Sequence, residues 1–75
     1  MNSKTLDLHG MGHSFVFKSV DDFVGYHIQN RTREIEIITG FSKEMKKIVN
    51  DVLEDYGASS KEQFGNAGKL IVDLT

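Results

Sequence analysis

The sequence predicts a small α/β sandwich of two layers, in which two helices cover one face of a mixed four-stranded sheet. Short stretches rich in β-branched or alternating apolar residues take turns with two segments of helical periodicity, giving the order β-α-β-α-β-β. Strands that alternate with helices favour parallel pairing of the first two strands. The uncovered face of the sheet would then be available as a binding surface.

The chain of 75 residues contains no cysteine, which predicts a single domain over residues 1–75 without disulfides or thiolate metal ligands. No apolar run approaches a membrane span, and the amino terminus lacks a signal-peptide pattern, so we expect a cytoplasmic protein without a membrane partner. Nine lysines and arginines against eleven acidic residues give a net charge of −2. This charge counts against a nucleic-acid binder unless the molecule carries a local basic patch.

The first strand lies in the stretch Thr-Leu-Asp-Leu-His-Gly near the amino terminus. Side chains alternate along a strand, so Leu6 and Leu8 are expected in the core and Asp7 and His9 together on the other face. The two polar residues would be about two strand positions, roughly 6.6 Å, apart. A carboxylate beside an imidazole is a candidate acid–base or phosphate-handling pair. A solvated Asp and His on an ordinary edge strand is the alternative.

Residues 14–29 predict the first helix, because their apolar side chains recur every three or four positions and Ser14 could cap the start. Residues 34–39, Glu-Ile-Glu-Ile-Ile-Thr, predict the second strand, with Ile35 and Ile37 on one face.

The second helix follows Ser42, a suitable N-cap, and stops at Gly57, a residue suited to the position after a helix. Residues 58–64 are polar and weakly strand-like, and a turn is expected at residues 65–68. Residues 70–74 then predict the closing strand.

The turn after the second strand forms a second candidate cluster. Parallel strands bring their carboxyl ends to one edge of a sheet, so this turn should lie beside His9 and Gly10. A helix start offers unpaired N–H groups and a positive dipole end to a phosphate, and lysines add charge there. The alternative is an ordinary strand-to-helix turn with solvated lysines. The candidate nucleic-acid-binding residues are Gly10, Thr39, Gly40, Ser42, Lys43 and Lys46.

The motif Leu-Asp-Leu-His-Gly at residues 6–10, the stretch at residues 35–40 and the element order together resemble the Smr domain. This nuclease-like module occurs at the end of some MutS paralogues and also as a stand-alone protein. The resemblance implies a fold similar to the carboxy-terminal domain of bacterial translation initiation factor three. It also implies nucleic-acid binding, often with endonuclease activity on DNA or RNA, and in some members action on messenger RNA at stalled ribosomes. Cleavage or binding roles fall on Asp7 and His9.

The second motif of that family is usually His-Gly-X-Gly, whereas this chain has Thr39, Gly40, Phe41 and Ser42. Thr39 stands where histidine is commonest, so any acid–base role of that histidine is absent. Ser42 replaces the second glycine, and Phe41 occupies a position that is often basic. These departures bear on catalysis rather than on the fold.

Other residues have plainer explanations. His13 is expected in a surface loop and His27 in the packing of the first helix, while Phe41 either stacks on a base or fills the edge of the core. Solvated loop charges are the simplest explanation of Arg31 and Arg33. We expect substrate contact less at Lys69 and Asn66, which flank the last turn, than at the candidates above.

The leading expectation is a nucleic-acid-binding domain, RNA preferred, with endonuclease activity centred on Asp7 and His9. His9 would take the proton from a 2′-hydroxyl and Asp7 would orient it. One carboxylate and one histidine make a sparse metal site, so neither a metal nor another cofactor is predicted. The alternative is a non-catalytic module that docks on nucleic acid, a ribosome or another protein.

Overall fold

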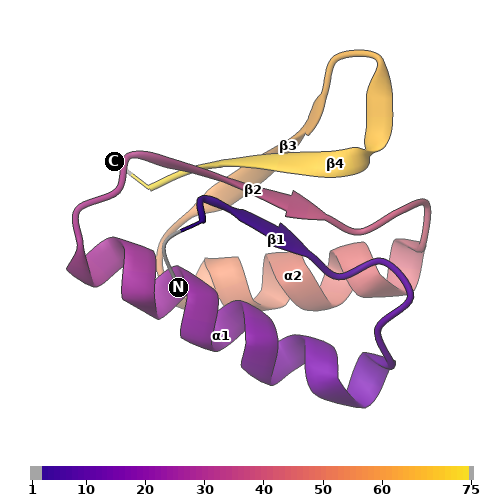
Figure 1. The fold of residues 1–75 in the computed structure, drawn as a ribbon, viewed down its shortest axis with the longest axis horizontal. Helices are drawn as coiled ribbons and strands as arrows, with labels where there is room; N and C mark the ends of the chain where they lie inside the picture. Colours follow the sequence, from indigo (N-terminus) through magenta and orange to yellow (C-terminus); the bar gives the residue numbers. More distant parts are fainter. Residues whose placement is uncertain (1–2, 75) are drawn as a thin grey trace.

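The computed structural model describes residues 3–74 and has the expected two layers, with both helices on one face of a four-stranded sheet (Figure 1). The strand order is β1-β2-β4-β3. β1 pairs with β2 in parallel and the other two pairs are antiparallel, so the sheet is mixed as predicted. The elements are β1 Thr5–Asp7, α1 His13–Gln29, β2 Glu34–Ile38, α2 Lys43–Asp55, β3 Ser59–Gln63 and β4 Asn66–Asp73.

The core lies between the sheet and the two helices. Ile35 and Ile37 of β2 sit opposite Val72 and Leu70 of β4, and all four side chains are buried. Because side chains alternate along a strand, the residues between them face the uncovered side. The helices close the core with buried side chains at helical spacing, namely Val16, Val20, Phe23, Val24, Met45, Val49, Val52 and Leu53.

The start of α1 differs from the expectation. The helix begins at His13, its N-cap is Gly12 in an extended conformation, and no side chain caps it. Ser14 therefore lies inside the first turn, and its assignment as the cap is wrong. The reason is local, because the tight turn after β1 ends at Met11 and the chain enters the helix directly from there.

The start and stop predicted for α2 are confirmed. The Ser42 hydroxyl accepts a hydrogen bond of 3.1 Å from the Met45 N–H. At the other end Gly57 has φ +70, and the N–H of Ala58 reaches back to the Leu53 carbonyl. This is the Schellman pattern, in which a left-handed glycine lets the last carbonyls find donors.

The expected turn at residues 65–68 is wrong. The hairpin loop is only Phe64 and Gly65, because Gln63 pairs with Asn66 and β4 starts there. Gly65 supplies the positive φ that the short loop needs. The carbonyl of Gly68 accepts hydrogen bonds from the chain after β2, and this long-range pairing keeps the Gly-rich stretch in the sheet.

Candidate functional site

The first turn, residues 8–12, places His9 just beyond the carboxyl end of the edge strand β1. The Leu8 N–H donates to the Ile38 carbonyl at 2.8 Å, and the Leu8 side chain is fully buried. The Met11 N–H then bonds the Leu8 carbonyl at 2.9 Å, and Gly10 has φ +81, as the third position of a type II turn requires. His9 is therefore held in a turn and not, as alternation implied, in the strand.

Asp7 and His9 contact each other directly. One Asp7 oxygen, Oδ1, accepts from the His9 backbone N–H at 3.0 Å and lies 3.0 Å from the His9 Nδ1. The side chains are 54% and 71% exposed. The His9 side-chain hydrogen bond, followed by its backbone N–H, lowers the pKa of the Asp7 carboxyl below the usual value of 3.8.

This geometry fixes the orientation of the ring. An ionised carboxylate only accepts hydrogen bonds, so Nδ1 carries the proton toward Asp7 and the other nitrogen, Nε2, points away from it. Within residues 3–74, no hydrogen bond engages Nε2 of His9. A neutral imidazole held by a carboxylate in this way presents a lone pair to the solvent, as a general base must.

The second turn, residues 39–42, lies beside the first. A side chain added at Gly40 would place its Cβ 3.8 Å from the Cβ of His9. The turn is fixed from its other side by Gly68, whose carbonyl accepts from the N–H groups of Thr39 at 2.9 Å and Gly40 at 3.0 Å. The structure therefore brings the two candidate clusters together at one edge of the sheet.

Thr39 and Ser42 both use their hydroxyl groups inside the protein. Thr39 is 2% exposed and donates to the Gly40 carbonyl at 2.9 Å, so its side chain faces inward. Ser42 caps α2 through its hydroxyl oxygen. The accessible parts of this turn are the half-buried Gly40 and the side chain of Phe41, which is 80% exposed.

The predicted lysine cluster is largely neutralised. Lys46 is only 18% exposed and its Nζ lies 2.9 Å from a carboxylate oxygen of Glu62 on β3. Lys47 pairs with Asp51 along α2 at 3.0 Å. Lys43 at the helix start is exposed and makes no ion pair with any residue in 3–74. The positive charge beside His9 is therefore small.

Comparison with protein families decides the relationship. The sequence model of the Smr domain matches residues 6–75, which include both turns and the hairpin. The chain belongs to the Smr domain family. Comparisons with curated proteins and with solved structures give no match. Smr domains form a nucleic-acid-binding, nuclease-like family. Neither helix of this Smr domain, within residues 3–74, is long and apolar enough to cross a bilayer.

Histidines outside the pair serve the structure. His27 of α1 is 3% exposed, and its two ring nitrogens lie 2.8 Å from the Thr32 hydroxyl and 2.9 Å from the Ser3 carbonyl. It is a packed residue, as predicted. His13 is the first residue of α1, and its Nδ1 lies 3.3 Å from a carboxylate oxygen of Glu44 on α2. This contact joins the starts of the two helices at the edge that carries His9.

The remaining candidates are engaged elsewhere or lie at the far end of the sheet. Lys69 extends over the open sheet face and pairs with Glu36 at 2.9 Å. Asn66 is occupied locally, because its Oδ1 accepts from the Gly68 N–H at 3.0 Å. Arg31 and Arg33 lie between α1 and β2, at the other end of the sheet from His9.

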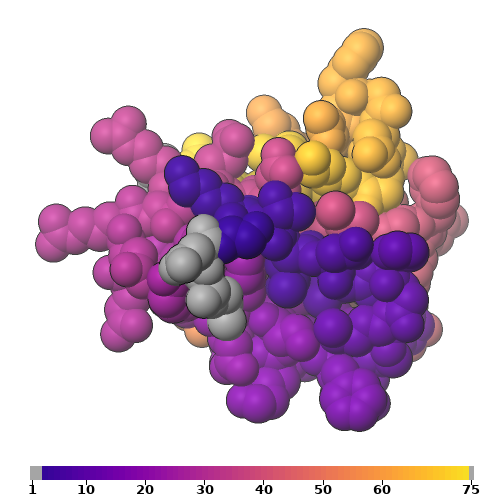
Figure 2. Space-filling view, viewed as in Figure 1, coloured from indigo at the N-terminus to yellow at the C-terminus, as the bar shows by residue number. Residues whose placement is uncertain are grey.

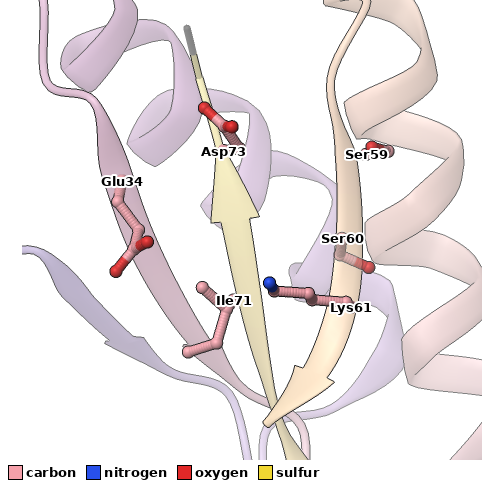
Figure 3. A pocket seen from close by; sticks show the side chains of 6 residues that line it. All are labelled: Glu34, Ser59, Ser60, Lys61, Ile71 and Asp73. Carbon is pink, nitrogen blue, oxygen red and sulfur yellow. The ribbon is translucent and has the colours of Figure 1, made fainter.

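The open face of the Smr domain also has a shallow depression, of about 230 Å³, far from the two turns (Figure 3). It lies at the amino end of β2, and the Lys61 side chain extends across it toward Ile71. Its lining residues are Glu34, Ser59, Ser60, Lys61, Ile71 and Asp73. Among residues 3–74, no group of three His, Asp or Glu side chains is placed to hold a metal ion.

Sequence reasoning missed two kinds of residue at the site. Gly68 was assigned to a turn, although its carbonyl fixes the second turn. Phe15 and Phe64 received no role, although they are 67% and 102% exposed. An aromatic residue beside the glycine of a hairpin loop, where polar residues are usual, was the available signal for Phe64.

Proposed function

We propose that this Smr domain binds RNA and cleaves it through Asp7 and His9. The observation that supports this best is the double contact of His9 with one oxygen of Asp7, at 3.0 Å each. These contacts fix the orientation of the exposed imidazole and leave its Nε2 free to act as a base. Orientation of a histidine by a carboxylate is a recurrent device for proton transfer.

In the proposed reaction the 2′-hydroxyl of RNA gives its proton to Nε2 of His9. The 2′-oxygen bonds to the adjacent phosphorus, the bond from phosphorus to the 5′-oxygen breaks, and that oxygen takes a proton from water. The products are a 2′,3′-cyclic phosphate and a 5′-hydroxyl. Asp7 keeps the ring oriented and stabilises the imidazolium that forms. The free N–H groups in the first turn of α2 and the ammonium of Lys43 are the groups that would bind the phosphate in this reaction.

The test is cleavage of an end-labelled single-stranded RNA in the presence of EDTA, with identification of the 3′ end. We expect a cyclic phosphate, no cleavage of the all-deoxy strand, and a loss of about a hundredfold or more in His9→Ala. His13→Ala is the matched control and should cut normally, because that ring contacts Glu44 instead. A requirement for Mg²⁺, or equal cleavage by His9→Ala, would contradict the proposal.

Binding without cleavage is the second candidate function. It is favoured by Thr39, which is buried in place of the usual histidine and leaves no second acid–base group in the second turn. In that case the wild-type domain would bind RNA and never cut it. The absence of any RNA binding would overturn both candidates in favour of a protein partner.

A further inference from the structure

Three exposed phenylalanines surround the end of the molecule that carries Asp7 and His9. Phe15, Phe41 and Phe64 are 67%, 80% and 102% exposed, and we call them the aromatic rim. They come from the first turn of α1, the second turn and the tip of the β3–β4 hairpin. Figure 1 shows that these three segments lie at the same end of the sheet.

Local contacts connect the rim to the two turns. Phe41 directly follows Gly40, the residue whose Cβ position is 3.8 Å from the Cβ of His9. The ring of Phe15 folds back on the first turn and comes within 3.5 Å of the Cβ position of Gly12. The hairpin of Phe64 is fixed to the second turn by the Gly68 carbonyl. In Figure 2 this hairpin stands out from the surrounding surface.

The fold makes little use of these rings. The aromatic pairs of the described residues join Phe23 and Tyr26 to His27, so no rim residue stacks on another ring within residues 3–74. The hydrophobic core excludes all three rim residues. Aromatic side chains that stay exposed and unstacked in this way are free to stack on a bound ligand.

We propose that the aromatic rim binds unpaired bases, so that the substrate of the site is single-stranded RNA. The inference rests on the proposed RNA binding and adds the form of RNA that is recognised. Aromatic faces stack on any base, but the bases of a duplex are already stacked and paired. A strand whose bases contact the rim would pass its backbone over the turns, where His9 can reach a 2′-hydroxyl.

The charges near the two turns favour recognition of RNA by base stacking rather than by contacts to its phosphates. Lys46 and Lys47 are paired with carboxylates, and Asp7 and Glu44 add negative charge beside Lys43. With few free cations near the turns, binding should release few counterions and depend only weakly on salt. Base stacking can supply the affinity that the phosphates do not.

The test measures binding of a labelled 2′-O-methyl single strand, which lacks the attacking hydroxyl and so separates binding from cleavage. We expect Phe41→Ala and Phe64→Ala each to weaken binding about tenfold, the effect of one lost stacked base. Phe41→Trp should bind at least as well as the wild type. Phe17→Ala is the matched control: Phe17 is 53% exposed on α1 outside the rim and should have no effect. Melting temperatures verify that each variant folds.

Equal binding of a fully paired duplex, or unchanged affinity in both alanine variants, would overturn the rim as a base-binding surface. These outcomes are distinct from failure of the proposed cleavage. If His9→Ala stops cleavage while the rim variants bind normally, the Asp7–His9 assignment stands and the rim assignment fails. If the rim variants lose binding but the wild type never cuts RNA, the rim assignment stands and the cleavage assignment fails.

Discussion

The two turns that follow the parallel strands β1 and β2 expose different kinds of side chain, although both join a strand to a helix at the same end of the sheet. At the first turn, His9 and the preceding Asp7 at the end of β1 both expose their side chains, and the two meet in solvent. The second turn buries Thr39 and exposes Phe41. Their positions in the sheet explain the difference. β1 is an edge strand, whereas β2 lies between β1 and β4, and β4 supplies the Gly68 carbonyl to the second turn.

This difference assigns separate tasks to the two motifs. The first turn, beside the edge strand β1, has open space on one side, which the proposed catalytic pair needs in order to reach a substrate. The second turn follows the inner strand β2 and is constrained from both sides. Its residues therefore fix the position of the first turn and contribute few accessible polar groups. With Thr39 buried, the second turn presents no acid–base side chain, while the contact between the turns is kept.

The largest effect on stability is expected from Gly68→Ala, which disturbs the second turn. The added Cβ would lie 3.2 Å from the Gly40 Cα, a backbone atom that cannot turn aside. We expect a loss of about 2 kcal/mol in the free energy of unfolding, as for other overpacked sites. Chemical denaturation measures it. In the matched variant Gly25→Ala the new atom is 3.2 Å from the flexible Tyr56 hydroxyl, and the loss should be much smaller. Equal losses would contradict a rigid second turn.

Just before the first turn, Asp7→Asn should affect cleavage and leave the fold nearly unchanged. The amide has the shape of the carboxylate but does not stabilise a charged imidazole, so we expect cleavage about tenfold slower. Initial rates on single-stranded RNA, together with melting curves, separate the two effects. A variant that cuts at the wild-type rate would show that His9 works without an oriented carboxylate.

Thr39→Val should show the reverse pattern. The substitution keeps the buried shape but removes the hydroxyl that donates to the Gly40 carbonyl at 2.9 Å. The expected loss of stability is about 1 kcal/mol, with cleavage and RNA affinity unchanged once the protein is folded. Denaturation and cleavage assays on the same preparation test it. A fall in cleavage greater than the fall in folded protein would give Thr39 a direct role.

The smallest effect concerns how the free energy of unfolding changes as the pH becomes acidic. The pKa of Asp7 is lowered in the folded state by its hydrogen bonds from His9, so the folded protein binds fewer protons than the unfolded chain near the usual value of 3.8. The contribution of Asp7 is thus present above that pH and is lost as the pH falls through the lowered pKa. The stability difference between wild type and Asp7→Asn should shrink as the pH falls below about 4. A difference that grows in acid would contradict this sign.

Much of this Smr domain could be predicted because the responsible signals are local. Apolar periodicity located both helices, and Ser42 and Gly57 marked the ends of α2 through contacts within a few residues of the chain. The sequence also predicted that Asp7 and His9 lie together, although it placed both on a strand by alternation, whereas His9 lies in the tight turn and contacts Asp7 directly. Membership of the family followed from the same motif and order.

Local signals failed wherever a distant segment competed for the same residues. The Gly-rich stretch before Lys69 has turn composition, yet pairing with the chain after β2 makes it part of β4. Lys46 has the sequence position of a phosphate-binding residue, but Glu62 of β3 neutralises it.

The sequence by itself determined the order of the elements, their apolar faces and the pair at the end of β1, because backbone periodicity and turn geometry are short-range. Only the tertiary structure decided that Thr39 faces inward and that Phe15 and Phe64 stay exposed at the edge that carries His9. The burial of Thr39 depends on which strands flank β2, and that arrangement is set by packing between residues far apart in the chain.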